Sequence, residues 1–205
     1  MRAGQTMVDS NGVQVSLFPL EYMNISQGEM SGSGHSHATS YAMDFLGWDA
    51  NGRVLKCPYY APFDCRVVQR ASYYAIWQSL NQVITPRGKQ YVTFVVMHDD
   101  TPPLLGQQAV QGQLIGHTGT KTYEGGTVSG DHVHLDGANG TFSGWMSGGH
   151  DLLNREHLYK LFFINDTVII DDYGYSWKTY TGGITPSKYH FKWVLYARKF
   201  RNRNV

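Results

Sequence analysis

The sequence predicts a mainly β protein, a compact antiparallel sheet domain with long loops and few short helices. Runs rich in Val, Thr and Tyr are short and are interrupted by Gly, Pro and Asn, in a chain with 23 glycines and 14% aromatic residues. This pattern is typical of many short strands joined by turns. With 205 residues, 41% of them hydrophobic, the chain can bury the core of one domain of fair size.

Charge is distributed unevenly along the chain. The formal net charge is only +1, yet seven of the 17 Lys and Arg residues lie beyond Tyr175, and none of the 16 Asp and Glu residues do. A basic segment with aromatic residues suits phosphate binding and base stacking. The acidic remainder of the chain disfavours nucleic acid as a partner.

Two further features bear on the compartment of the protein. The sequence has no run approaching the roughly 18 apolar residues of a membrane span, and its start lacks the apolar segment of a signal peptide. We therefore expect no export by that route. Cys57 and Cys65 are spaced unlike zinc or redox pairs, so free buried thiols are expected in preference to a disulfide.

The first half of the chain reads as extended segments and turns. An apolar segment over 13–20 precedes a predicted strand over 41–47, which contains Asp44. A carboxylate in such a run requires a cation or hydrogen bonds, and a metal ion is one candidate partner. Asn51-Gly52 predicts a hairpin between 44–48 and 53–57. A strand is expected over 65–69, and a turn or irregular piece over 75–80.

The clearest strand covers 91–98, which is β-branched and aromatic nearly throughout. Strict alternation of side chains would place His98, at its end, on the same face as Phe94 and Val96. A solvated edge residue is the alternative interpretation of this histidine. After Pro102-Pro103, the segment 111–119 reads as a short strand that enters a glycine-bounded turn.

Two histidines, His132 and His134, alternate with Val133 and Leu135. In a strand, both imidazoles share one face while the apolar pair points to the other. This arrangement suits a metal site or acid–base chemistry, although two solvent-facing histidines would show the same spacing.

The last part of the chain is predicted in less detail. The content of 151–161 favours a helix capped by Asp151. Buried strands are expected over 161–164 and 168–170. An aromatic and basic C-terminal extension is expected over 173–205.

Several of these segments together resemble one protein family. Their order along the chain resembles that of the lysostaphin-like zinc endopeptidases, which cut bacterial cell-wall peptides. The segments are His37 with Asp44, the strand-end His98, Gly112–Gly119, and His132-Val133-His134. Tyr60-Ala61-Pro62-Phe63-Asp64 also resembles the Ala-Pro turn of that family. The resemblance covers about Tyr22 to Asp136 and is greatest to phage lysins and tail-tip proteins. It implies a peptidase domain over 1–172 with a substrate groove across the sheet.

The resemblance also implies roles for individual residues. His37, Asp44 and His134 would be the ligands of Zn²⁺, and His98 and His132 the catalytic pair. Two imidazoles and one carboxylate leave a fourth position open, as catalytic zinc sites require. Sequence leaves open which of His98 and His132 is the general base.

Other residues near the pattern keep alternative interpretations. His35 competes with His37 as a ligand, and His117 is either a substrate contact or a polar turn residue. Asp131 and Asp136 are expected to be solvated at the surface in preference to orienting a histidine. His150, His157 and His190 have no partners in the pattern and are interpreted as ordinary residues.

The implied substrate is the peptide part of peptidoglycan. The C-terminal extension would contact virion tail proteins or anionic wall polymers, and the expected location is the virion tail, or the host cytoplasm before lysis. One alternative is a catalytically inactive wall-binding or tail-structural module of the same fold. Another is a bacterial cell-division or autolytic enzyme, which the missing export signal disfavours.

Overall fold

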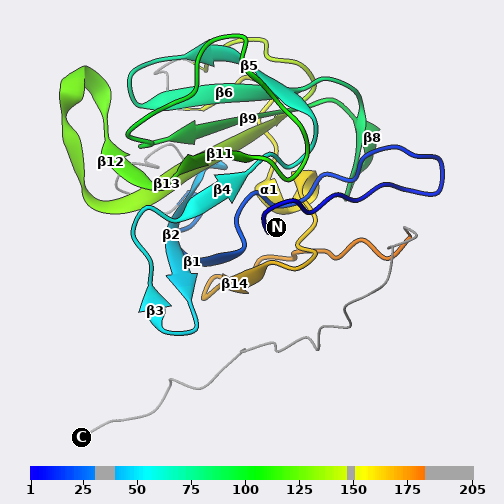
Figure 1. The fold of residues 1–205 in the computed structure, drawn as a ribbon, viewed down its shortest axis with the longest axis horizontal. Helices are drawn as coiled ribbons and strands as arrows, with labels where there is room; N and C mark the ends of the chain where they lie inside the picture. Colours follow the sequence, from blue (N-terminus) through cyan, green and yellow to red (C-terminus); the bar gives the residue numbers. More distant parts are fainter. Residues whose placement is uncertain (31–39, 147–150, 183–205) are drawn as a thin grey trace, which may run out of the picture.

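A computed structural model describes residues 1–30, 40–146 and 151–182 of the chain. Its main element is a ten-stranded sheet with the order β10-β5-β6-β9-β13-β2-β1-β14, to which β12 and β3 add at β13 and β2 (Figure 1). All pairs in this sheet are antiparallel except β1 with β14. The predicted mainly β, antiparallel fold is confirmed.

The elements have the following bounds. The strands are β1 (Tyr22–Gln27), β2 (Met43–Asp49), β3 (Gly52–Arg53), β4 (Pro58–Tyr60), β5 (Cys65–Arg70), β6 (Tyr74–Ser79), β7 (Val83–Thr85), β8 (Gly88–Gln90), β9 (Val92–Met97), β10 (Gln108–Ala109), β11 (Leu114–His117), β12 (Gly119–Lys121), β13 (Thr127–Asn139) and β14 (Val168–Ile170). The helices are the 3₁₀ turn η1 (Tyr123–Gly125) and α1 (Leu158–Leu161). β11 pairs with β4 and β7 with β8 in two small separate sheets.

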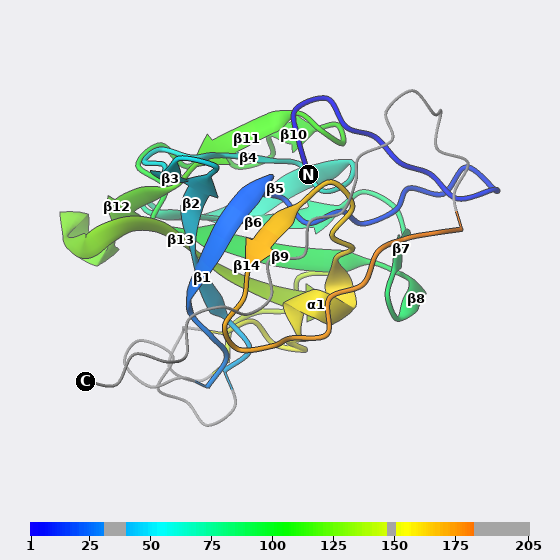
Figure 2. The same cartoon turned by 90° about the horizontal axis from the view of Figure 1, so that it is seen from below.

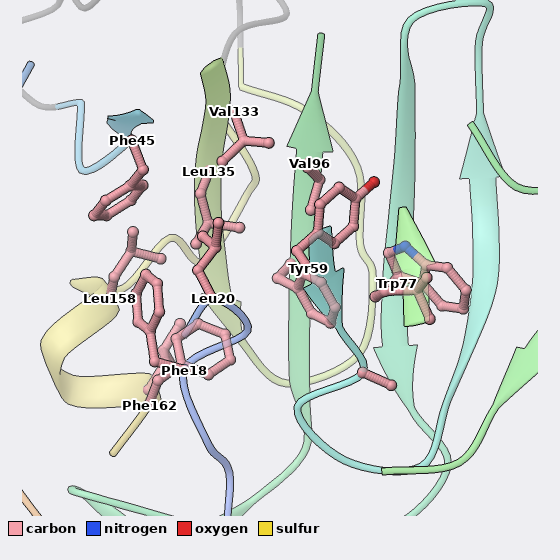
Figure 3. Close-up of a cluster of buried hydrophobic side chains, with 14 of the residues drawn as sticks. Phe18, Leu20, Phe45, Tyr59, Trp77, Val96, Val133, Leu135, Leu158 and Phe162 are labelled. Carbon is pink, nitrogen blue, oxygen red and sulfur yellow. The ribbon is translucent and has the colours of Figure 1, made fainter. Parts of the chain in front are cut away.

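The main core covers one face of the large sheet. β13 directs Val133 and Leu135 into it, beside Phe45 of β2 and Val96 of β9 (Figure 3). β4, α1 and the N-terminal segment around Phe18 contribute further side chains to this core. At the edge of the sheet, β14 lies beside β1 (Figure 2). Because Val133 and Leu135 are buried, the intervening His134 must point to the other face of the sheet.

Phe94 ties the central strand β9 to this core. Its side chain is fully buried and meets the rings of Phe63 at 5.8 Å and Phe162 at 6.0 Å, both edge to face. We expect Phe94→Ala to lower the free energy of unfolding by about 3–5 kcal/mol, because it removes a large buried ring and leaves a cavity. Denaturant titration measures this. Leu104→Ala is the control, since Leu104 is 67% exposed and should change stability by less than about 0.5 kcal/mol. Equal effects of the two variants would contradict the described core.

One strand was not expected from the sequence. Residues 75–80, predicted to be irregular, belong largely to β6, which pairs with β5 and β9 and buries Ala75, Ile76 and Trp77. The segment is extended because both of its faces are buried and strands pair with it on both sides. It lacks the β-branched run of β9, so its composition did not indicate a strand. The strand predicted over 91–98 and the hairpin at Asn51-Gly52 are confirmed, the latter as β2 with a two-residue β3.

The last predicted elements were partly wrong. Helix α1 is a single turn that begins after His157, and the Asp151 carboxylate accepts a hydrogen bond from Ser40 Oγ at 2.7 Å instead of capping a helix. The segment 161–164 ends α1 and forms only isolated bridges at Phe163. β14 is a strand, but its residues are exposed or half-buried because it lies at the sheet edge.

The remaining predictions concern thiols, the C-terminal extension and membrane spans. Cys57 and Cys65 are free and buried, as expected. Tyr175 and Trp177 pack against the main core, and the boundary predicted at 172 stays a prediction. Among the described residues, no helix is long and apolar enough to cross a membrane.

Candidate functional site

The site forms where three strands present polar side chains on the face opposite the main core. Asp44 of β2 is the register partner of His134 of β13, and His134 is in turn the partner of Met97 of β9. His98 follows Met97 directly. The sheet therefore brings together residues that are far apart in the sequence.

Asp44 lies between the two histidines of β13. Its Oδ1 atom is 3.2 Å from His134 Nδ1, and its Oδ2 atom is 3.6 Å from His132 Nε2. The ring centroid of His98 is 4.5 Å from that of His132 and 6.2 Å from that of His134. Of the five residues predicted to bind zinc or act in catalysis, the structure brings these four together.

Backbone carbonyls set the tautomers of two histidines. Nδ1 of His132 lies 2.7 Å from the Gly130 carbonyl oxygen, and Nδ1 of His98 lies 2.7 Å from that of Lys121. Because a carbonyl oxygen only accepts hydrogen bonds, each Nδ1 carries a proton. In the neutral rings Nε2 is then the unprotonated nitrogen, and for His132 this is the atom that faces Asp44.

His98 reaches the site through an unusual backbone conformation. Its φ of 73° is in the left-handed region, and this reverses the direction expected from strand alternation. The prediction that His98 shares a face with Phe94 and Val96 was therefore wrong, because alternation holds only while the backbone stays extended. Gly119 permits this geometry, since a Cβ there would collide with the His98 carbonyl oxygen.

The environment of His98 favours the neutral imidazole. Burial is the main cause that lowers the pKa of His98 to about 4, and the neighbouring His132 and His134 act in the same direction. The Lys121 carbonyl opposes this shift. At neutral pH the ring is uncharged and can accept a hydrogen bond at Nε2.

The donor set of Asp44 and His134 fits a zinc ion. Two ligands about 2.1 Å from one zinc ion at the tetrahedral angle lie about 3.4 Å apart, close to the 3.2 Å between Asp44 Oδ1 and His134 Nδ1. His37 and His35, the candidates for the other imidazole ligand, lie outside the described residues. Within the part of the chain that the structure describes, no three His, Cys, Asp or Glu side chains are placed to hold one metal ion together.

Asp131 and Asp136 are buried, so the expectation that both are solvated was wrong. Asp131 accepts hydrogen bonds from Thr118 Oγ1 and from the backbone N–H of Lys56. Asp136 accepts hydrogen bonds from the backbone N–H groups of Gly137 and Leu152, and burial raises its pKa to about 7. Both carboxylates fasten β13 to neighbouring segments, on either side of its two histidines.

Two further histidines lie elsewhere. His117 belongs to β11, and its backbone N–H donates to Asp99 Oδ2 at 3.2 Å. None of its described contacts joins the imidazole to the site. His157, expected to be an ordinary residue, pairs with Glu29 at 2.8 Å and stacks on Tyr41 with ring centroids 3.9 Å apart. His150 and His190 lie outside the described residues.

The predicted substrate groove stays a prediction. Two cavities, with volumes of about 580 and about 300 Å³, are lined by residues other than those of the site. No role was predicted from the sequence for the aromatic residues Tyr73 and Tyr74. They directly precede the segment 75–80, which was predicted to be irregular, and Tyr74 is the first residue of β6.

Comparison with known proteins gives one sequence relative of note. No family model matches the chain. The chain is 37% identical over 177 residues to Morphogenesis protein 1 of Bacillus phage B103, an alignment that covers 83% of this chain and 46% of the phage protein. The chain thus spans about half the length of this relative.

Solved structures show weaker similarity. The M23 metalloprotease pseudoalterin from the deep sea is 18% identical, with 77% of each chain covered and a TM-score of 0.44. The antimicrobial peptidase lysostaphin from Staphylococcus simulans is 18% identical, with 58% of this chain and 43% of that chain covered and a TM-score of 0.36. Similarities at this level carry no argument about what this chain does.

Proposed function

We propose that this protein is a zinc-dependent endopeptidase that hydrolyses peptide bonds in bacterial cell-wall peptidoglycan. The observation that carries the proposal is the convergence of Asp44, His132, His134 and His98 on one face of the sheet. The order and spacing of these residues resemble the lysostaphin-like zinc endopeptidases, and their geometry fits the roles that the resemblance implies.

In this proposal, Asp44 and His134 hold the zinc ion together with His37. When bound, the ion would polarise the scissile carbonyl and lower the pKa of a water molecule to about 7. His132 accepts a proton at Nε2, because its Nδ1 already carries a proton, which it donates to the Gly130 carbonyl oxygen. The neutral ring of His98 lies with its centroid 4.5 Å from that of His132, and it hydrogen-bonds the reacting groups next to His132.

The setting we propose is a bacteriophage. The relative from Bacillus phage B103 is named for morphogenesis, which suits a virion tail-associated wall-degrading protein, and its phage source also suits a lysin. The protein would then be located in the virion tail, or in the host cytoplasm before lysis. The C-terminal extension over 173–205 is proposed to contact tail proteins or anionic wall polymers.

A second candidate is a catalytically inactive tail-structural or wall-binding module of the same fold. The name of the phage relative favours it, because morphogenesis describes assembly rather than hydrolysis. The two candidates differ in one measurable property, since only the enzyme turns over its substrate.

Metal content and wall clearing test the proposal together. We expect about one zinc ion per purified chain by elemental analysis, and loss of turbidity of peptidoglycan suspensions that stops with a chelator and returns with added Zn²⁺. Suspensions of different peptidoglycan chemistry are needed, because the bond cleaved differs between wall types. One zinc ion without clearing of any of them would favour the inactive module. Absence of zinc from a folded protein would refute the mechanism.

A further inference from the structure

Four aromatic side chains form a patch beside the candidate site. The tyrosine–tryptophan patch consists of Tyr73, Tyr74, Tyr123 and Trp145. Tyr73 meets Tyr74 at 5.0 Å and Tyr123 at 6.5 Å, and Tyr74 meets Trp145 at 5.4 Å, all edge to face. Tyr123 is 69% exposed, and the other three are half-buried. The patch is therefore accessible to a ligand although its members pack on one another.

The strand register fixes where the patch lies. Tyr74 of β6 is the partner of Met97, which is the partner of His134. Tyr74 thus shares the sheet face of the site and lies two strands from His134, about 10 Å at the usual strand spacing. The Tyr73 carbonyl also accepts the backbone N–H of His98 at 2.8 Å. The patch therefore lies next to the site along the sheet.

The chemistry of the patch indicates a neutral ligand with hydroxyl groups. Its four side chains offer ring faces, phenolic hydroxyls and an indole N–H, but none of them carries a charge. Gln69 Nε2 donates to the Tyr74 hydroxyl at 3.1 Å, which adds an amide at its edge. Exposed aromatic rings with polar tips bind ligands that have apolar faces and polar edges. A pyranose ring has C–H groups on its faces and hydroxyls around its rim.

We propose that the tyrosine–tryptophan patch binds a sugar of the glycan strand that carries the peptide to be cut. This inference rests on the proposed function, because it names the part of the substrate that lies beside the scissile bond. The roughly 10 Å from Tyr74 to His134 corresponds to about three residues of extended peptide. A sugar on the patch would thus hold a bond a few residues along its peptide at the site.

Two matched substrates test the proposal, a peptidoglycan stem peptide without sugar and the same peptide still attached to its disaccharide. We expect the wild-type protein to have the higher kcat/KM for the sugar-bearing substrate. Tyr123→Ala should reduce the ratio of the two kcat/KM values by about three- to tenfold, the range for loss of one aromatic contact. Tyr123→Phe should keep most of the ratio because the ring remains.

The control is Tyr91→Ala, which removes a tyrosine that is 37% exposed and outside the patch. This variant should keep the wild-type ratio. A wild-type ratio near one would overturn the proposal. So would a Tyr123→Ala variant that loses activity equally on both substrates, since the patch would then contact peptide.

A binding measurement separates this inference from the proposed function. Titration calorimetry with peptide-free glycan chains should show weak binding to the wild type and weaker binding to Tyr123→Ala. If neither peptide is cleaved but this difference is found, the proposed enzyme activity fails and the sugar site stands. If glycan chains do not bind, the sugar site fails whatever the activity.

Discussion

His134→Ala is expected to lose zinc and activity together. Asp44 and His134 are register partners on neighbouring strands, with Nδ1 and Oδ1 3.2 Å apart, so the backbone itself holds both proposed ligands. Without the imidazole the ion has two proposed protein ligands instead of three. We expect zinc per chain to fall below about one tenth, and kcat/KM to fall at least about a thousandfold, because several kcal/mol of transition-state stabilisation depend on the ion.

Two companion variants make this experiment specific. Asp44→Asn keeps the shape of the side chain and removes its charge, so zinc should again be lost. His117→Ala removes a histidine of β11 that no described contact joins to the site, and it should keep a full complement of zinc. An active, zinc-free His134→Ala protein would refute the ligand assignment. Equal loss of zinc in His117→Ala would point to a different site.

The parts of the site that sequence predicted are those fixed by strand alternation. In an extended backbone, Val133 and Leu135 cannot enter the core without directing His132 and His134 to the other face. Asp44 was predicted for a related reason, since a carboxylate inside an apolar run requires a partner. These inferences need only local geometry.

The parts that sequence missed depend on contacts between distant segments. Gly119, on another strand, leaves room for the left-handed conformation of His98. The residues around His98 in the sequence do not predict this conformation. Asp131 is buried because Thr118 and Lys56 supply its hydrogen bonds. β6 is a strand because β5 and β9 flank it. Such features follow from tertiary packing, which overrides local preference.

His132→Ala should separate metal binding from catalysis. The His132 ring is proposed to accept a proton and not to bind zinc, so the variant should keep about one zinc ion per chain. We expect kcat to fall about 10²- to 10⁴-fold, the usual contribution of a positioned acid–base group, with a smaller change in KM. Elemental analysis and steady-state kinetics on the same preparation measure both. A large loss of zinc would mean that His132 is a ligand and that its role and that of His134 are exchanged.

A double variant then decides whether His132 and His98 act on one proton transfer. His98→Asn is the suitable second change, because asparagine tolerates the left-handed backbone that residue 98 adopts better than alanine does. If the two rings serve the same step, the double variant should lose little more activity than the worse single variant. If they serve separate steps, the losses should multiply. The rings are close enough to share a substrate atom, at 4.5 Å between centroids, and each is oriented by a carbonyl of its own. Because a different carbonyl orients each ring, we infer that the two rings act in separate steps. We therefore expect the losses of activity to multiply.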